Sequence, residues 1–201
     1  MEARQKVLTQ AETMFMRYGI KSVTMDDIAR DLGMSKKTLY QFVNNKADLI
    51  QQIFKQHIQE EKSAMSSIVS NAENAIEEII GIAKYILQLL RTMSPRTIYE
   101  LRKYYRDIWE LIEGMHQEHI YKVIKGNLDR GIGEGLYRED LNADIVSKLY
   151  VGKSSLVVDE DLFPLEDYTK EALFIEFIRY HIHGVASQRG LTLLDKYTIK
   201  K

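Results

Sequence analysis

A run of basic and hydrogen-bonding side chains lies between Leu32 and Ala47, a stretch in which the sequence has no Asp or Glu. Its members are Lys36, Lys37, Thr38, Tyr40, Gln41 and Lys46. Ammonium groups bind phosphate as point charges, and hydroxyl and amide groups bind phosphate oxygens or base edges. These residue types therefore favour contact with a nucleic acid, with an ordinary solvated polar face as the alternative.

Two short helices around a glycine turn are predicted to position this run. Thr24 is placed to cap the first helix, with Asp27 returning a hydrogen bond to the Thr24 backbone. Gly33 suits the left-handed conformation that ends a helix, and Ser35 can cap the next one. Leu39 and the apolar residues after it then point to one side of the second helix, so the basic and polar residues face the other side.

Lys46 falls in the first turn of a third helix, which Asn45 can cap. A lysine is electrostatically out of place at the positive end of a helix, and a bound phosphate would resolve that conflict. We therefore expect Lys46 to hold a DNA backbone while the second helix enters a major groove. In that groove, the amide of Gln41 is suited to contact adenine at two points.

Three short motifs carry a resemblance to a known family: T-x-x-D-I-A at residues 24–29, G-M-S-K-K-T-L-Y at 33–40 and N-K-x-D-L at 45–49. Over about residues 4–54 the chain resembles the DNA-binding domain of the TetR family of bacterial transcriptional regulators. Val43 departs from the family pattern, which usually has Phe there. The matching residues are Thr24, Ile28, Ala29, Gly33, Ser35, Thr38, Leu39, Tyr40, Lys46, Asp48 and Leu49. The predicted DNA contacts are Thr24, Ser35, Lys36, Lys37, Thr38, Tyr40, Gln41 and Lys46.

The composition of the 201-residue chain excludes several other classes of protein. A formal net charge of -1 rules out the global basic field of a histone-like protein, so any nucleic-acid affinity must be local. The absence of cysteine excludes disulfides, thiolate zinc sites and cysteine nucleophiles, and it is compatible with the cytoplasmic location that we expect. The N-terminus has no apolar run, so we expect no signal peptide. The most apolar segment, residues 76–90, contains charged residues and is too short to span a membrane.

The remaining pattern predicts an all-α chain of about nine helices. An apolar stripe over residues 3–18 closes at Gly19, and a long helix runs from Lys46 to about residue 70. We predict a three-helix helix-turn-helix DNA-binding domain at residues 1–46, joined by the long helix to a helical ligand-binding and dimerisation domain at residues 47–201. Further helices are predicted at residues 76–93, 95–105, 107–130, 142–157 and 167–188, with a glycine-rich turn at residues 131–135.

The resemblance implies that the last two helices, about residues 142–157 and 167–188, join their copies in a four-helix homodimer interface. A two-fold dimer also fits the physics of DNA reading, because one short helix in one groove buries little surface. Two related helices, about 34 Å or a multiple of a helical turn apart, would read a palindromic operator. Double-stranded DNA and a second copy of the chain are thus the expected partners.

Aromatic and amphipathic side chains are dense in the middle of the chain. The resemblance implies a cavity for a small-molecule effector in this region, and aromatic walls with polar tips are typical of such cavities. Ordinary core and surface positions are the alternative interpretation. The predicted pocket residues are Tyr85, Leu89, Met93, Tyr104, Tyr105, Trp109, Met115, His116, His119 and Tyr150.

His116, Glu118 and His119 raise the separate hypothesis of a helical metal-dependent enzyme. Two histidines three residues apart form a weak metal site, and we find no nucleophile with a base, so we predict no enzyme activity, cofactor or metal. The preferred hypothesis is a ligand-responsive repressor, in which an effector changes the separation of the two DNA-reading helices. A constitutive or partner-controlled DNA-binding regulator without an effector is the alternative.

Overall fold

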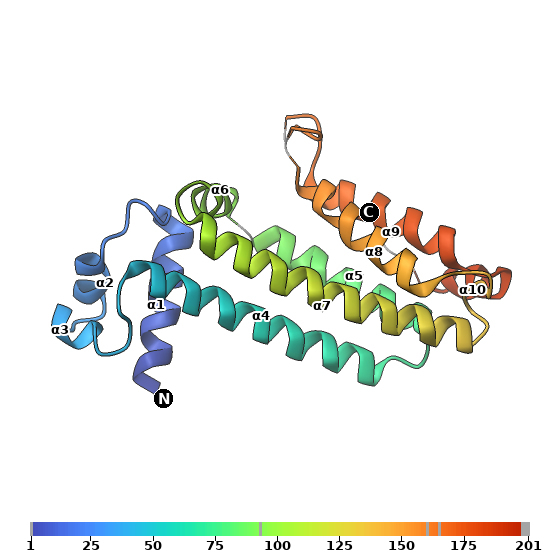
Figure 1. Ribbon diagram of the computed structural model, residues 1–201, viewed down its shortest axis with the longest axis horizontal. Helices are drawn as coiled ribbons and strands as arrows, with labels where there is room; N and C mark the ends of the chain where they lie inside the picture. The colour runs from blue at the N-terminus through green and yellow to red at the C-terminus, as the bar shows by residue number, and fades with distance from the viewer. Residues whose placement is uncertain (1, 93, 160, 165, 198–201) are drawn as a thin grey trace. The chain divides into compact units, whose positions relative to one another are not determined.

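The computed structural model describes residues 2–92, 94–159, 161–164 and 166–197, and within these ranges the regular structure is helical (Figure 1). The described residues contain no β-strand, so the all-α prediction is confirmed. No helix among them is both long enough and apolar enough to cross a lipid bilayer. The helices are α1 (Glu2–Tyr18), α2 (Met25–Asp31), α3 (Lys36–Leu39), α4 (Lys46–Asn71), α5 (Ala75–Thr92), α6 (Pro95–Tyr104), α7 (Arg106–Gly133), α8 (Ala143–Ser154), the 3-10 helix η1 (Ser155–Val158), α9 (Lys170–Val185) and α10 (Gln188–Leu194).

The prediction of one helix over residues 167–188 is wrong about where that helix begins and ends. The helix α9 begins at Lys170, because the Thr169 side chain caps it by accepting a hydrogen bond from the backbone N–H of Ala172. At its other end Ala186 is extended, with a ψ of 141°, and Ser187 then caps the separate helix α10. The described residues therefore contain ten α-helices where about nine were predicted.

Local capping explains where the first helices begin and end. Thr24 and Asp27 form the predicted capping box of α2, and the Ser35 side chain caps α3. Ser94 caps α6 in the same way, by accepting a hydrogen bond from a backbone N–H in its first turn. Glycines in the left-handed conformation supply the tight turns after α1, α2 and α7. They are Gly19 (φ 86°), Gly33 (φ 64°) and Gly135 (φ 67°).

The chain packs as two compact units. Unit 1 comprises Met1–Glu61 and Met93–His116, and unit 2 comprises Lys62–Thr92 and Gln117–Lys201. Both α4 and α7 therefore contribute to each unit. The functional boundary predicted between residues 46 and 47 falls inside unit 1 and stays a prediction.

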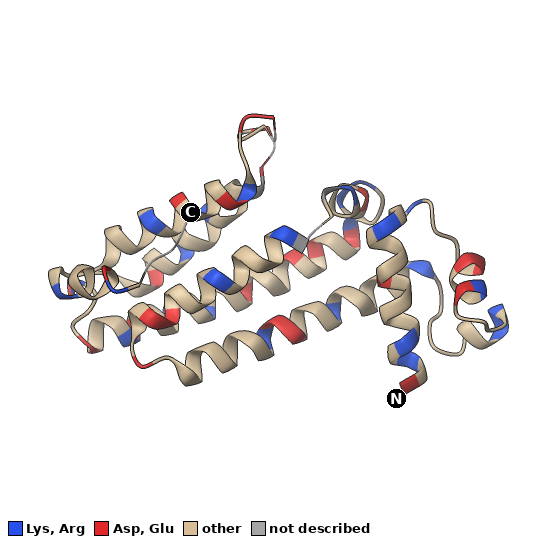
Figure 2. Ribbon diagram, turned by 180° about the vertical axis from the view of Figure 1, so that it is seen from behind, with Lys and Arg blue, Asp and Glu red and all other residues tan. Residues whose placement is uncertain are grey.

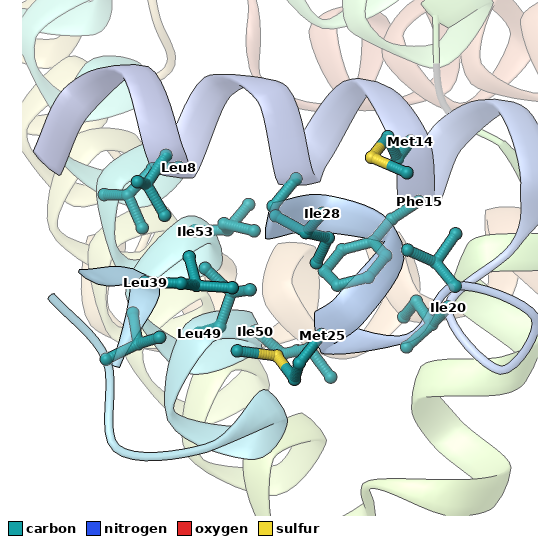
Figure 3. Packing of buried hydrophobic residues seen from close by; sticks show 14 of the residues in the cluster. Leu8, Met14, Phe15, Ile20, Met25, Ile28, Leu39, Leu49, Ile50 and Ile53 are labelled. Atoms are coloured by element: carbon teal, nitrogen blue, oxygen red, sulfur yellow. The ribbon is translucent and has the colours of Figure 1, made fainter. Parts of the chain in front are cut away.

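Unit 1 is built around apolar side chains of α1 to α4 (Figure 3). Phe15, Ile28, Leu39 and Leu49 come from four different helices, and each is at most 2% exposed. Full burial of such a side chain contributes about 1.5–3 kcal/mol, so these contacts hold α1, α2 and α3 against α4. We call α1, α2, α3 and residues 46–61 of α4 the head. Leu101 of α6 joins the same apolar cluster.

Unit 2 combines an apolar core with a buried polar network. Arg130 of α7 donates a hydrogen bond to Glu78 of α5 at 2.9 Å, although the Glu78 side chain is only 2% exposed. The Tyr137 hydroxyl donates to the side-chain oxygen of Asn127 at 2.8 Å, and the Asn127 amide donates to the carbonyl of Ala75 at 2.9 Å. Burial raises the pKa of Tyr137, so its hydroxyl remains a neutral donor. These bonds fasten the start of α5 to the end of α7.

Candidate nucleic-acid interface

The start of α3 presents the predicted polar run to solvent. The Ser35 side chain accepts a hydrogen bond from the backbone N–H of Thr38 at 3.1 Å, which fixes the first turn. Leu39 is fully buried in the core of the head, so the opposite side of the turn faces outward. The exposed side chains of the run include those of Lys36, Lys37, Tyr40 and Gln41.

The α-helical part of the predicted second helix is shorter than the polar run. It ends at Leu39, and Tyr40 and Gln41 lie in the turn that follows. The backbone N–H of Tyr40 still donates to the Lys36 carbonyl at 3.0 Å, and that of Gln41 donates to the Thr38 carbonyl at 3.1 Å. These bonds continue the helical path for about one more turn.

Lys36 pairs with a carboxylate that the sequence did not reveal. Its ammonium lies 3.0 Å from the carboxylate of Asp26 in the first turn of α2, and that hydrogen bond raises the pKa of Lys36. The stretch around α3 thus contains no acidic residue in the sequence, but the fold places Asp26 beside it. Both side chains are more than half exposed, so the pair adds little stability and leaves the ammonium accessible to a phosphate.

Lys46 has a structural partner as well. Its ammonium donates a hydrogen bond to the backbone carbonyl of Val23, in the loop before α2, and lies 5.8 Å from the centre of the Phe15 ring. Burial lowers the pKa of Lys46, and nearby carboxylates partly offset that effect. Lys46 therefore fastens the start of α4 to the loop before α2. A phosphate contact would use the remaining donors of the ammonium.

Basic residues also lie at both ends of α1 (Figure 2). Arg4, near its N-terminal end, donates two hydrogen bonds to the side chain of Gln52 on α4, at 3.1 and 2.6 Å. Sequence reasoning did not select Arg4, because a single cation on a helix has no diagnostic spacing. The contact with Gln52 places an exposed guanidinium beside the second turn of α4.

A buried carboxylate of α6 holds the end of α1 and the loop after it. Glu100 accepts a hydrogen bond from the backbone N–H of Lys21 at 2.8 Å, and the Thr97 hydroxyl donates to the Phe15 carbonyl at 3.1 Å. Burial disfavours the charged form of Glu100, but the hydrogen bonds from Lys21 and Arg96 outweigh burial and lower its pKa. These contacts position the head, and no local motif marks them, because the partners lie far apart in the sequence.

The predicted pocket residues are divided between the two units. Those in unit 1 are Tyr104, Tyr105, Trp109, Met115 and His116, and those in unit 2 are Tyr85, Leu89, His119 and Tyr150. Met93 lies outside the described residues. Tyr105, Trp109 and Met115 pack against the apolar core of unit 1, whereas Tyr104 is 45% exposed. The assignment of these residues to an effector pocket stays a prediction.

His116 and Glu118 have separate partners. His116 Nε2 lies 3.0 Å from the Glu61 carboxylate, and Glu118 accepts a hydrogen bond from Lys122 at 2.6 Å. Burial opposes protonation of His116, but the hydrogen bond with Glu61 outweighs burial and raises the pKa of His116. Within the described residues, no three His, Cys, Asp or Glu side chains are placed to share a metal ion.

A groove of about 440 Å³ lies between α8 and α9 on unit 2. Tyr150 forms part of its wall, with its ring centre 4.7 Å from those of Phe177 and His181. Burial lowers the pKa of His181 to about 4, and His181 Nε2 has no hydrogen-bond partner in the part of the chain that the structure describes. The Lys153 ammonium lies 4.8 Å from the centre of the Tyr180 ring, and both residues line the groove.

Comparison with known proteins identifies the head. Residues 7–53 match the family model described as bacterial regulatory proteins, tetR family, a range that covers most of the head. The uncharacterized HTH-type transcriptional regulator YvaF of Bacillus subtilis is 26% identical over 163 residues, which cover 81% of this chain and 84% of YvaF. Residues 7–53 therefore form a DNA-binding domain of the tetR type. The family description and the name of YvaF both refer to regulators of transcription.

Two further proteins are similar to this chain over most of its length. The HTH-type transcriptional repressor KstR2 of Mycolicibacterium smegmatis is 22% identical over 147 residues, which cover 71% of each chain. The crystal structure of FadR from Bacillus subtilis in complex with stearoyl-CoA is 19% identical and has a TM-score of 0.70. The match covers 90% of this chain and 98% of FadR, so the two proteins share their fold.

Proposed function

We propose that this protein is a regulator of the tetR family, a dimeric repressor that binds a palindromic operator and releases it when a small effector binds. The observation that carries the proposal is the exposed surface of α3 and the turn after it, held in place by the fully buried Leu39. A short polar helix fixed rigidly to a core is suited to enter a major groove. The name of KstR2 as a repressor supports repression as the direction of control.

The proposed DNA contacts divide into two kinds. Lys37 and Gln41 read bases, because both are exposed and neither is needed to hold the head together. Lys46 holds the phosphate backbone at the start of α4, beside its structural bond to Val23. The other proposed contacts are Thr24, Ser35, Lys36, Thr38 and Tyr40.

The dimer is proposed to form through α8 and α9. Ile145 and Leu149 of α8 are 54% and 53% exposed, and Tyr180 of α9 is 68% exposed. Exposed apolar side chains gathered on one face are typical of a protein interface. A two-fold pair through this face would supply the two α3 helices that a palindromic operator requires.

A small-molecule effector is supported by FadR, whose crystal structure with this fold contains stearoyl-CoA. Binding that favours one dimer geometry would reduce operator affinity by about 5 to 150-fold, the usual range of allosteric coupling. The alternative is a constitutive or partner-controlled regulator, for which no small molecule changes DNA affinity. Titration of operator binding with stearoyl-CoA and shorter amphipathic molecules separates the two. We also propose a cytoplasmic location, where a bacterial operator is accessible.

The DNA contacts are tested with a duplex selected from a random library by the wild-type protein. Lys37→Ala and Gln41→Ala should change the preference between selected and altered duplexes. Lys46→Gln keeps a donor for Val23 but removes the charge, so it should weaken binding to all duplexes and reduce the salt slope by about one unit. Lys125→Ala, on α7 of unit 2, is the matched control. If the three head variants behave alike, the division of contacts is wrong, and a wild-type protein without salt-dependent duplex binding would refute the proposal.

A further inference from the structure

The segment between η1 and α9, residues 159–169, is an acidic arm that contains no Lys or Arg. It extends beyond the ends of α8 and α9 (Figure 1). Leu162 is 53% exposed and Tyr168 is 45% exposed, so the arm presents apolar groups to solvent together with its carboxylates. Its described acidic residues are Asp159, Asp161, Glu166 and Asp167.

Internal contacts connect the described residues of the acidic arm. The carboxylate of Asp159 accepts a hydrogen bond from the backbone N–H of Asp161 at 3.0 Å. The Pro164 carbonyl accepts one from the backbone N–H of Tyr168, also at 3.0 Å. The rings of Phe163 and Tyr168 pack edge to face, with their centres 5.4 Å apart. A preorganised arm of this kind loses less conformational entropy on docking than a free loop.

The groove between α8 and α9 has the charge opposite to that of the arm. Arg138, Lys153 and His183 line it, and none of its described lining residues is Asp or Glu. Arg138 lies 3.3 Å from Asp140, but its side chain is half exposed and remains accessible. Leu149 supplies part of an apolar wall. A basic groove with an apolar wall complements a segment that exposes carboxylates, a leucine and a tyrosine.

The acidic arm and the Arg138–His183 part of the groove lie at opposite ends of the helix pair. Arg138 precedes α8 and His183 is in the last turn of α9, whereas the arm joins η1 to the first turn of α9. The 12 residues of α8 separate these ends by about 18 Å. A two-fold axis perpendicular to the pair makes the two copies antiparallel. The arm end of one copy then faces the Arg138–His183 end of the other.

We propose that the acidic arm of each protomer docks in the basic groove of the second copy, which gives the dimer two symmetric, charge-complementary contacts. The inference rests on the dimer of the proposed function and names the groups that set its register. Complementary charges of this kind govern partner choice and register more than raw affinity. The groove is therefore a composite site, complete only when the partner supplies its arm.

The test reverses the charge of each side separately. The arm variant is Asp161→Lys with Asp167→Lys, and the groove variant is Arg138→Glu with His183→Glu, at the end of the groove that faces the partner's arm. Each variant alone opposes like charges in both contacts of its homodimer, so its dimer dissociation constant should rise at least about tenfold in sedimentation equilibrium. In a heterodimer of the two variants both contacts are again complementary. An equimolar mixture should therefore regain association close to that of the wild type, and added salt should weaken the rescue.

The outcomes separate this inference from the proposed function. Failure of the mixture to associate better than either variant overturns the docking of arm in groove. Unchanged dimers of both variants also overturn it, while the dimer of the proposed function stands. A wild-type protein that stays monomeric overturns both, whereas duplex binding by the head is measured independently.

Disulfide cross-linking gives a second readout that does not depend on charge. The chain has no cysteine, so Leu162→Cys in one copy and Gly184→Cys in another provide one thiol each. Oxidation of the mixture should yield a cross-linked dimer, because Gly184 is at the groove and has open space at its Cβ position. Gly126→Cys on α7, with equally open space, is the matched control for Gly184→Cys. Equal cross-linking to both positions would contradict the proposed docking.

Discussion

The head and the α8–α9 surface differ in how far their apolar side chains are buried. In the head, Leu39 and Leu49 are fully buried although the helices that carry them are short or exposed on one side. On α8 and α9, Leu149 and Tyr180 are more than half exposed. The head thus completes its packing within one chain, whereas the α8–α9 surface leaves apolar side chains exposed. Under the proposed dimer, the α3 surface is set by folding and the α8–α9 surface by association.

The largest effect is expected when a leucine is replaced by alanine, once in the head and once on the α8–α9 surface. Leu39→Ala removes a fully buried side chain from the head and should lower the free energy of unfolding by about 2–5 kcal/mol. Leu149→Ala, at a 53% exposed position, should change it by less than about 1 kcal/mol in dilute, monomeric protein but weaken association. Urea denaturation and sedimentation measure the two quantities. Equal loss of stability in both variants would remove the contrast between the regions.

A smaller effect is expected at the close contact between α10 and the turn after α7. A Cβ on Gly190 would lie 2.1 Å from the backbone oxygen of Leu136, so Gly190→Ala forces a backbone shift and should cost about 1–3 kcal/mol. Gly126→Ala on α7 meets no atom within 4 Å and should stabilise the helix by up to about 1 kcal/mol. Thermal unfolding compares the variants. The difference in stability between the two variants shows whether the part of unit 2 outside the α8–α9 surface is tightly packed.

Substitutions in the capping box of α2 test whether this box stabilises the head and its proposed DNA-reading surface. Thr24→Ala removes the side-chain oxygen that accepts from the Asp27 N–H and should cost about 0.5–2 kcal/mol. Thr24→Ser retains the hydroxyl and should restore most of that stability. Chemical denaturation of the three proteins, followed by duplex binding at a temperature where all are folded, checks the result. Full stability of Thr24→Ala would show that tertiary packing alone fixes α2.

The smallest expected effect is a pH dependence of the head. The hydrogen bond with Glu12 raises the pKa of His57, and burial opposes it only in part. A raised folded pKa adds stability that is fully present below the ordinary histidine pKa, about 6.5, and that is lost as pH rises through the raised value. The free energy of unfolding should therefore fall between about pH 6 and pH 8, by under about 1 kcal/mol because the imidazole is partly exposed.

His57→Gln should flatten this pH profile, and His183→Gln, an exposed histidine of α9, is the control. Denaturation curves measured across the same pH range provide the comparison. A profile that keeps its slope in His57→Gln would assign the effect to another group, such as the His116 and Glu61 pair.

Features whose partners lie within a few residues could be predicted from the sequence. The Thr24 and Asp27 capping box and the Ser35 cap are present as predicted. Asn45 accepts a hydrogen bond from the Asp48 N–H at 2.9 Å, so the start of α4 is also confirmed. In each case the sequence contains both partners at the spacing that one helical turn requires.

Contacts between separate elements could not be predicted in the same way. Asp26 reaches Lys36, and Glu100 reaches the backbone of Lys21, only after the chain has folded back on itself. Aromatic density was also ambiguous, because Trp109 packs against the core of unit 1 and core and ligand walls use the same residue types. The separate helix α10 was not predicted, because its 7 residues are too few to form a recognisable apolar period.

In the proposed dimer, the uncovered leucine and tyrosine of α8 and α9 would link gene control to the abundance of the regulator. A cell that makes few copies would hold mostly single subunits, each with one α3 and half of the proposed palindrome reader. In that range, halving the expression level lowers the amount of paired protein about fourfold by mass action. Transcription of the controlled gene would then respond steeply to the dose of its own regulator.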